Sequence, residues 1–287
     1  MMRVAVVGAG TMGHGIAQIA AQSGCTVTLT DARPDALPKA LTRIGENLNG
    51  AVDRKKLSAQ DAEATMARIS TSPDAAAAAA GADLVVEAIV EDLAVKSALF
   101  QVLDRAAPAD AILATNTSAL SVARIAAATT RPSRVIGMHF FNPVHIMKLV
   151  EVVTHDGVAD HIVQRTRDAA MAFGKEPIVV RDTPGFASSR LGVILGLEAM
   201  RMVEQGVASP ADIDKAMELG YGHPMGPLRV SDMVGLDVRL AIADYLHSQL
   251  KDAQYAPPEI LRKKVKAGEL GKKTGKGFHE WEKPKSS

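Results

Sequence analysis

His139 stands twelve residues before Glu151 in the stretch GMHFFNPVHIMKLVEVV, residues 137–153, which is otherwise largely apolar. A histidine can act as a general base near neutral pH, because the unperturbed pKa of this residue type is about 6.5. A carboxylate bonded to the other ring nitrogen would fix the tautomer and stabilise the protonated ring. The stretch equally fits a core histidine beside a solvated acid, so the surrounding elements must decide between these interpretations.

The same stretch predicts two strands, over residues 135–140 and 148–154, joined by a short connection that contains Pro143. Such a connection has no room for a crossover helix, so we expect an antiparallel pair at one edge of a sheet. That pairing would bring His139 and Glu151 close together.

Apolar runs alternate with helical patterns over the first 180 residues, which predicts a mostly parallel sheet in an α/β domain. After Asp182 the strand signal stops and only helical patterns follow. We therefore predict an α/β Rossmann-type domain over residues 1–184 and an all-α domain over residues 185–287. The runs that we expect to form buried strands are RVAVVGAG, TVTLTD, DLVVEAI, AILATNT, RVIGMHF, KLVEVVT and EPIVVRD.

The second domain contains several sequence signals for the starts and ends of helices. One helix is predicted from an N-cap at Ser209 to a terminator at Gly220, and MGPLRVSDMVGLDVRLAIADYLHSQL is expected to form a single helix. The helix that follows Pro184 is apolar on more than one face, so we expect it to be buried in a subunit interface.

A glycine-rich loop follows the first predicted strand and opens a helix. Gly8, Gly10 and Gly13 form a GxGxxG pattern, and the next strand ends in Asp31, eighteen residues after the third glycine. This is a complete dinucleotide-binding unit, in which the helix N-terminus meets the pyrophosphate. Asp31 would accept hydrogen bonds from the ribose and repel a 2′-phosphate, which favours NAD over NADP, although Arg33 softens this preference. The loop residues expected to contact the cofactor are Gly8, Gly10, Thr11, Met12 and Gly13.

Composition excludes several other classes. Lys and Arg total 33 against 32 for Asp and Glu, and this near-neutral balance gives no support for binding to nucleic acid or to a membrane. The single cysteine, Cys25, rules out an internal disulfide, and the histidines lack metal-ligand spacing, so we expect no metal. With no signal peptide and no apolar stretch long enough to span a bilayer, we expect a soluble cytoplasmic protein.

The motifs, taken in order, closely resemble those of the 3-hydroxyacyl-CoA dehydrogenases, and more specifically the bacterial 3-hydroxybutyryl-CoA dehydrogenase branch. The resemblance extends from Arg3 to about Trp281. It implies an NAD-binding Rossmann-type domain, a helical domain that forms a homodimer, an acyl-CoA in the cleft between them, and the chemistry of fatty-acid β-oxidation. The motifs are the glycine loop, VEAIVEDLAVK, TNTSAL, HFFNPVHIMKLVE, DTPGF, GHPMGP and GKKTGKGF.

The resemblance also implies roles for individual residues. His139 becomes the catalytic base and Glu151 its partner. Ser118 would bind the 3-hydroxyl or thioester region of the substrate and lie by the cofactor, and Asn142 would orient the nicotinamide. The remaining cofactor contacts implied are Glu91, Lys96 and Lys273.

Two positions concern the substrate. Many family members read PGFIVNR where this chain reads PGFASSR, so Ser189 replaces an asparagine of the active site. A single lost or water-bridged hydrogen bond costs on the order of 1 kcal/mol, so we expect the change to tune the acyl pocket and leave the reaction intact. Lys55 lies in a basic cluster, residues 54–56, that is either a solvated helix end or a site for the phosphates of coenzyme A.

The sequence therefore favours NAD-dependent oxidation of a short-chain (S)-3-hydroxyacyl-CoA. Three alternative functions were compared with it. Dehydrogenases of free β-hydroxy acids use a lysine in the interdomain helix, and the helix from Pro184 has no lysine before Lys215. A dehydrogenase of hydroxyacyl groups on a carrier protein and a non-catalytic NAD-binding protein both stay open.

Overall fold

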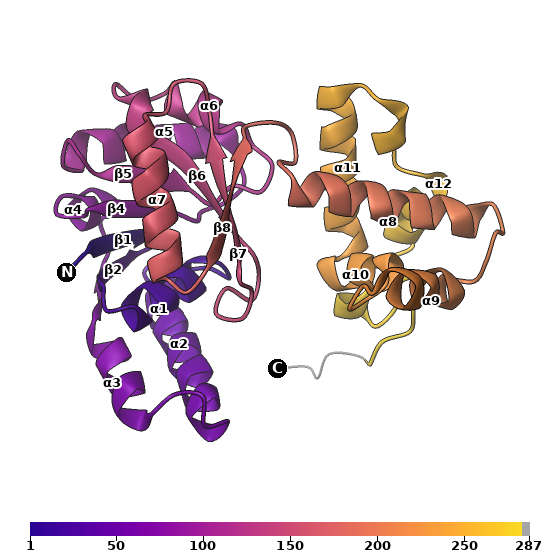
Figure 1. Ribbon diagram of the computed structural model, residues 1–287, viewed down its shortest axis with the longest axis horizontal. Coiled ribbons are helices and arrows are strands. Elements are labelled where there is room, and N and C mark those ends of the chain that lie inside the picture. Colours follow the sequence, from indigo (N-terminus) through magenta and orange to yellow (C-terminus); the bar gives the residue numbers. More distant parts are fainter. Residues whose placement is uncertain (283–287) are drawn as a thin grey trace. The chain divides into compact units, whose positions relative to one another are not determined.

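The computed structural model describes residues 1–282, which form two compact units (Figure 1). The boundary falls between Thr183 and Pro184. The first unit is built on one sheet and the second contains only helices. This confirms the predicted fold class, an α/β Rossmann-type domain with a mostly parallel sheet followed by an all-α domain.

The sheet has eight strands in the order β3-β2-β1-β4-β5-β6-β7-β8. Every neighbouring pair is parallel except β6 and β7, which are antiparallel as predicted. The predicted place of this pair at the edge of the sheet was wrong, because β8 pairs with β7 and forms the edge. The strand order reverses beside β1, and an open α/β sheet binds its ligand at such a switch point, beyond the carboxyl ends of the strands. The bounds are β1 (Arg3–Val7), β2 (Thr26–Thr30), β3 (Ile69–Ser72), β4 (Leu84–Glu87), β5 (Ile112–Thr115), β6 (Val135–Phe140), β7 (Leu149–Thr154) and β8 (Glu176–Arg181).

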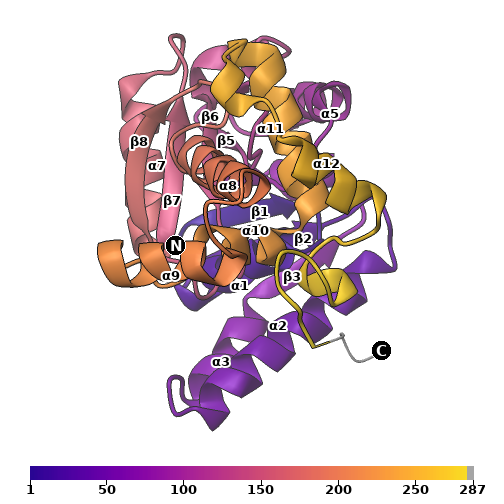
Figure 2. The same ribbon diagram turned by 90° about the vertical axis from the view of Figure 1, so that its right-hand side faces the viewer.

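Helices cover both faces of the sheet. Alternate side chains of a strand point to opposite faces, so Val4 and Val6 of β1 pack in one core with α1, α2 and α7, while Ala5 and Val7 pack in another with α4, α5 and α6. The pair α2 and α3 extends from the sheet (Figure 2). The bounds are α1 (Gly13–Gln22), α2 (Ala36–Asp53), α3 (Ala59–Ala67), α4 (Ala75–Ala79), α5 (Leu93–Ala106), α6 (Val122–Ala126), η1 (Pro132–Arg134) and α7 (Asp160–Ala172).

The helical unit has its own core, to which α8, α9, α10, α11 and α12 all contribute. Among the helices within residues 1–282, none is long and apolar enough to cross a membrane. The bounds are α8 (Ser188–Glu204), α9 (Pro210–Tyr221), α10 (Pro227–Val234), α11 (Leu236–Leu250), η2 (Ala253–Tyr255), α12 (Glu259–Lys266) and η3 (Lys272–Thr274).

Two strand predictions were wrong. The edge strand β3 was missed because its sequence, ISTS, carries no apolar run. The run EPIVVRD does form β8, but this strand is not buried: Ile178 and Val179 are 41% and 48% exposed, because β8 is the other edge of the sheet.

Two helix ends also differ from the prediction. Ser209 is the N-cap of α9 as expected, but the helix continues past Gly220 and ends at Gly222, whose φ of +72° forms a left-handed cap. The apolar stretch after Met225 is two helices, because Gly235 at φ +100° separates α10 from α11. In both cases the glycine with positive φ ends the helix.

Candidate active site

His139 and Glu151 lie directly opposite each other on the antiparallel strands β6 and β7. Nδ1 of His139 is 2.7 Å from Oε2 of Glu151, and the carboxylate is fully buried while the histidine is 6% exposed. A carboxylate accepts the hydrogen bond, so Nδ1 carries a proton and Nε2 is the basic nitrogen of the neutral ring. The structure thus brings the pair together in the arrangement that suits a base and its orienting acid.

The local sequence explains why this pairing forms. Gly137 faces Val153, and a Cβ on that glycine would lie 2.6 Å from the valine Cβ, so only a glycine allows the strands to approach here. Asn116, the residue directly after β5, fixes the end of β6, because its Oδ1 accepts a hydrogen bond from the Phe140 amide at 2.9 Å. These contacts hold the backbone on both sides of His139.

Ser118 lies three residues after the end of β5, at the carboxyl ends of the parallel strands, and is held there by Glu91. One carboxylate oxygen of Glu91 accepts hydrogen bonds from the Ser118 amide at 2.9 Å and hydroxyl at 3.3 Å. It also accepts from the Thr117 hydroxyl at 2.6 Å and the Ala119 amide at 3.2 Å. Four donors on one oxygen fix the loop that carries Ser118. Since β5 and β6 are parallel neighbours, Ser118 and His139 share one edge.

Lys96 is buried beside Glu91, at 1% exposure. Its ammonium lies 2.5 Å from Glu87 of β4 and 3.4 Å from the other oxygen of Glu91. Glu87 is fully buried and also accepts from the Thr115 hydroxyl at 2.7 Å. A chain of charges therefore runs from the interior of the sheet to the Ser118 loop. Sequence reasoning missed Glu87, although a lone carboxylate inside the apolar run DLVVEAI was a visible signal.

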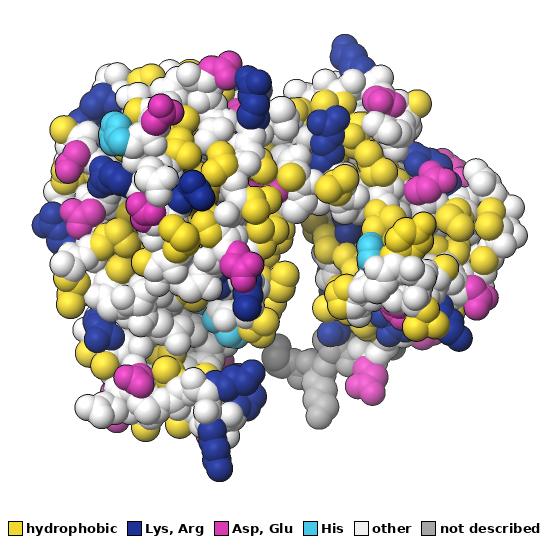
Figure 3. All heavy atoms as spheres, viewed as in Figure 1, with side chains coloured by type: hydrophobic (Ala, Val, Ile, Leu, Met, Phe, Trp, Pro, Cys, Tyr) yellow, Lys and Arg dark blue, Asp and Glu magenta, His cyan; other side chains and the backbone are white. Residues whose placement is uncertain are grey.

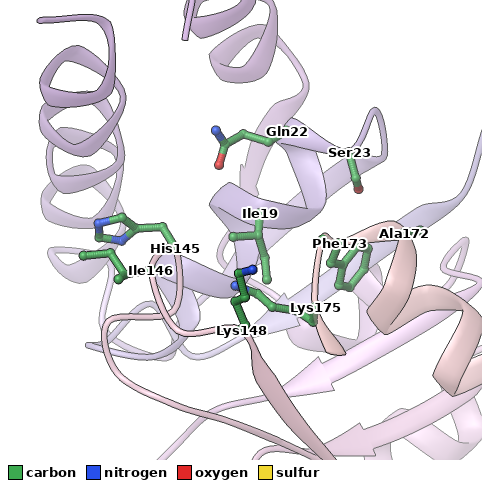
Figure 4. Close-up of a pocket in the computed structure, with 10 residues that line it drawn as sticks. Ile19, Gln22, Ser23, His145, Ile146, Lys148, Ala172, Phe173 and Lys175 are labelled. Carbon is green, nitrogen blue, oxygen red and sulfur yellow. The ribbon is translucent and has the colours of Figure 1, made fainter. Parts of the chain in front are cut away.

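Asn142 lies in the exposed connection between β6 and β7. Lys175, after α7, holds this connection in place, since its buried ammonium donates to the carbonyls of Val144 and Met147 at 2.5 and 2.8 Å. Burial lowers the pKa of Lys175. The pocket beside it, of about 400 Å³, is lined by the end of α1, the connection and the end of α7 (Figure 4).

The glycine loop has the shape that a dinucleotide requires. Gly8 has a φ of +105°, and a Cβ there would lie 2.5 Å from the Ala88 carbonyl oxygen. A Cβ on Gly13 would lie 1.6 Å from the Gly8 carbonyl oxygen, whereas one on Gly10 would meet nothing within 4 Å. The outer glycines are thus needed for packing, while Gly10 leaves open space before α1, whose first turn has no acidic residue. This space fits a pyrophosphate at a helix N-terminus.

Asp31 is joined to that loop. Its carboxylate accepts hydrogen bonds from the Ala9 amide and the Arg33 amide, both at 2.8 Å, and the Arg33 guanidinium lies 3.7 Å away. Thr11 is exposed and Met12 half-buried at the start of α1. The expected cofactor residues of the loop therefore lie together at the carboxyl ends of β1 and β2.

Three predicted residues lie elsewhere. Lys55 is exposed just after α2, with a φ of +57°. In the helical unit, Ser189 is half-buried in the first turn of α8, and Lys273 in η3 pairs with Asp237 at 2.6 Å. Within residues 1–282 no cluster of three histidine, cysteine or acidic side chains could hold a metal.

Two family models match this chain. Residues 3–183 match the family "3-hydroxyacyl-CoA dehydrogenase, NAD binding domain", and residues 185–281 match "3-hydroxyacyl-CoA dehydrogenase, C-terminal domain". The chain belongs to the 3-hydroxyacyl-CoA dehydrogenase family. The resemblance drawn from the motifs is thereby confirmed.

Individual relatives agree with this membership. A probable 3-hydroxybutyryl-CoA dehydrogenase of Bacillus subtilis is 44% identical over 284 residues, which is 99% of each chain. The mitochondrial hydroxyacyl-coenzyme A dehydrogenase of Homo sapiens is 45% identical over 97% of this chain and 90% of the relative. The crystal structure of (S)-3-hydroxybutyryl-CoA dehydrogenase from Ralstonia eutropha superposes with a TM-score of 0.94 at 37% identity, over 99% of this chain and 100% of that one.

As a member of the 3-hydroxyacyl-CoA dehydrogenase family, the protein is an NAD-dependent oxidoreductase, and NAD is its cofactor. The family membership also confirms the expected reaction class, oxidation of a hydroxyacyl-CoA. The geometry of the loop of residues 8–13 fits that cofactor, as described above.

Proposed function

We propose that the protein oxidises short-chain (S)-3-hydroxyacyl-CoA, with 3-hydroxybutyryl-CoA as its substrate, to the 3-oxoacyl-CoA by means of a His139–Glu151 acid–base pair. The observation that carries this proposal is the 2.7 Å contact between the histidine Nδ1 and a carboxylate oxygen that is fully buried. The names of relatives, several of which are 3-hydroxybutyryl-CoA dehydrogenases, support the choice of substrate.

The oxidation removes a hydride from C3 of the substrate and a proton from its hydroxyl oxygen. Bound NAD supplies the hydride acceptor. Nε2 of His139 accepts the hydroxyl proton, and the ring becomes an imidazolium that donates from Nδ1 to Glu151. Because the carboxylate is enclosed by protein, its attraction for that positive charge is weakly screened by water. In the reverse direction the same imidazolium returns the proton to the oxygen.

The other predicted residues keep their proposed roles, except that Lys96, whose side chain is 1% exposed, is too buried for the expected direct contact with the cofactor. Ser118 binds the substrate oxygen at the sheet edge that it shares with His139, and Asn142 orients the nicotinamide. The cofactor contacts are the loop of residues 8–13, Asp31, Glu91 and Lys273, with Lys96 acting through Glu91, which it holds at 3.4 Å. Ser189 contacts the acyl group, and Lys55 meets a phosphate of coenzyme A.

We further propose a cytoplasmic homodimer that forms through the helical unit. Exposed hydrophobic side chains support the dimer, since Leu191 of α8 and Leu219 and Tyr221 of α9 are each at least 70% exposed. Figure 3 shows hydrophobic side chains on the surface of this unit. Light scattering coupled to size-exclusion chromatography tests the dimer directly, and a mass of 30.2 kDa in solution would contradict it.

Initial rates of NADH formation test the reaction. The assay compares (S)-3-hydroxybutyryl-CoA with free 3-hydroxybutyrate, first with NAD and then with NADP. We expect turnover of the thioester only, and faster turnover with NAD. Turnover of a hydroxybutyryl group only when it is attached to a carrier protein would move the function to carrier-bound substrates. Tight NADH binding without turnover of any hydroxyacyl thioester would indicate a non-catalytic protein.

A further inference from the structure

The backbone pairing of β5 with β6 ends before it reaches His139. The last paired residues are Thr115 of β5 and Gly137 of β6. Strand β6 continues to Phe140 beside β7, so His139 lies beyond the part of β6 that the backbone of β5 holds. A misplacement of about 1 Å in an active site can lower a rate by roughly 10²-fold. On the β5 side, the position of His139 therefore depends on contacts other than this ladder.

The side chain of Asn116 supplies such a contact. Its Oδ1 accepts a hydrogen bond at 2.9 Å from the amide of Phe140, the residue directly after His139. Phe140 is 2% exposed, so its amide would be costly to leave unpaired. The backbone amide of Asn116 donates to the Glu87 carbonyl of β4 at 2.8 Å, which anchors the asparagine to the sheet. The side-chain carbonyl thus continues the ladder where the backbone of β5 ends.

Asn116 also begins the loop that carries Ser118. In that loop the Thr117 hydroxyl and the Ser118 amide both donate to one carboxylate oxygen of Glu91, at 2.6 and 2.9 Å. Asn116 therefore joins a loop that Glu91 fixes to the strand end that carries His139. Under the proposed function, Ser118 binds the substrate oxygen and Nε2 of His139 accepts its proton. The spacing between these two side chains then decides whether both reach the same atom.

We infer that Asn116 is a positioning residue, which fixes the spacing between His139 and Ser118 through the hydrogen bond from the Phe140 amide to Oδ1. The inference rests on the proposed function and adds a residue that acts through its base. Asn116 needs no contact with the substrate or the cofactor for this role. Loss of the hydrogen bond should therefore slow the chemical step and leave cofactor affinity unchanged.

The test measures steady-state rates with (S)-3-hydroxybutyryl-CoA and NAD, and NADH affinity by fluorescence. Asn116→Leu removes the acceptor at similar volume, so kcat should fall by roughly 10- to 10²-fold while KM and the dissociation constant of NADH change less than about threefold. Asn116→Asp keeps an acceptor oxygen and should retain kcat within about fivefold. The matched control is Asn47→Leu: Asn47 is a half-buried asparagine of α2 that donates to Gln18 at 3.0 Å, and its loss should leave kcat unchanged.

A double-mutant cycle with His139→Ala separates positioning of the base from a general effect on the fold. If Asn116 acts through His139, its substitution has nothing left to misplace once the imidazole is gone. Asn116→Leu should then lower kcat by less than about twofold in the His139→Ala background. A residue that only stabilises the fold would cause the same loss of kcat in both backgrounds.

Each other outcome overturns the inference in a distinguishable way. An unchanged kcat in Asn116→Leu, or an equal loss in both backgrounds, refutes the positioning role and leaves the proposed function standing. If Asn116→Asp is as slow as Asn116→Leu, the accepting oxygen is not what matters, and the role passes to the amide NH₂ group. If His139→Ala is as fast as the wild type, the proposed function is refuted and the inference falls with it. Should circular dichroism show that Asn116→Leu does not fold, Asn116→Ala takes its place in the cycle with the same expected losses.

Discussion

Glu151→Gln removes the negative charge opposite His139 and keeps nearly the same side-chain volume. The carboxylate oxygen lies 2.7 Å from Nδ1 and is fully buried, so the charge acts on the imidazolium with little competition from water. Two unit charges about 4 Å apart interact by ~4 kcal/mol at an effective dielectric constant of 20. At about 1.4 kcal/mol per factor of ten, this corresponds to ~10³-fold in rate. Since the amide oxygen can still accept one hydrogen bond, we expect kcat to fall by about 10²- to 10³-fold.

The assay is the steady-state rate with (S)-3-hydroxybutyryl-CoA and NAD, with NADH affinity measured separately by fluorescence. The dissociation constant of NADH should change less than about threefold, because the charge stabilises only the protonated ring. Glu176→Gln is a matched control: the same substitution on the adjacent strand β8, at a side chain that is 77% exposed, should leave kcat unchanged. A kcat of Glu151→Gln within about threefold of wild type would show that the Glu151 charge does not stabilise the imidazolium, as would a parallel loss of NADH binding in a folded variant.

Three further substitutions test other parts of the structure. Asp31→Ala should weaken NAD binding and bring the NAD-to-NADP ratio of kcat/KM closer to one, because the carboxylate that opposes a 2′-phosphate is gone; an unchanged ratio would refute that assignment. Glu87→Gln should lower the free energy of unfolding in urea by about 3 kcal/mol, because the buried Lys96 ammonium loses its partner at 2.5 Å. It should also raise KM for NAD, because Lys96 in turn holds Glu91. An unchanged free energy of unfolding together with an unchanged KM would contradict the coupling of Glu87, Lys96 and Glu91. Asp104 is desolvated by burial, yet hydrogen bonds from Thr130 and Arg134 outweigh that effect and lower its pKa from 3.8 to about 2. Its carboxylate thus contributes about 2 kcal/mol to the free energy of unfolding above pH ~4, and this contribution is lost as the pH falls toward 2. The free energy of unfolding of the wild-type protein should therefore drop over that range more steeply than that of Asp104→Asn. Parallel curves for the two proteins would show that Asp104 is not the group responsible.

Local patterns made much of the fold predictable. The glycine loop and the following Asp31 form one contiguous unit, and the short connection at Pro143 allowed only an antiparallel pair of strands. The close approach of His139 and Glu151 followed from those two strands alone. Edge strands were harder: β3 needs no apolar run, and the apolar residues of β8 are exposed because no further strand covers them.

The parts that could not be predicted depend on which distant side chains meet. Glu87 and Lys96 are separated by a strand end, a loop and a helix turn, and nothing in their spacing shows that both are buried. The helix boundaries at Gly222 and Gly235 depend on backbone angles, and Gly220 shows that a glycine can equally lie inside a helix. Such tertiary pairings override local signals.

The role of His139 as the base can be tested by comparing catalysis with cofactor binding in His139→Ala. We expect kcat with (S)-3-hydroxybutyryl-CoA to fall by roughly 10²- to 10⁴-fold while the dissociation constant of NADH stays nearly unchanged, as removal of a general base requires. Equal losses of turnover and NADH affinity would contradict the claim and make His139 a structural histidine.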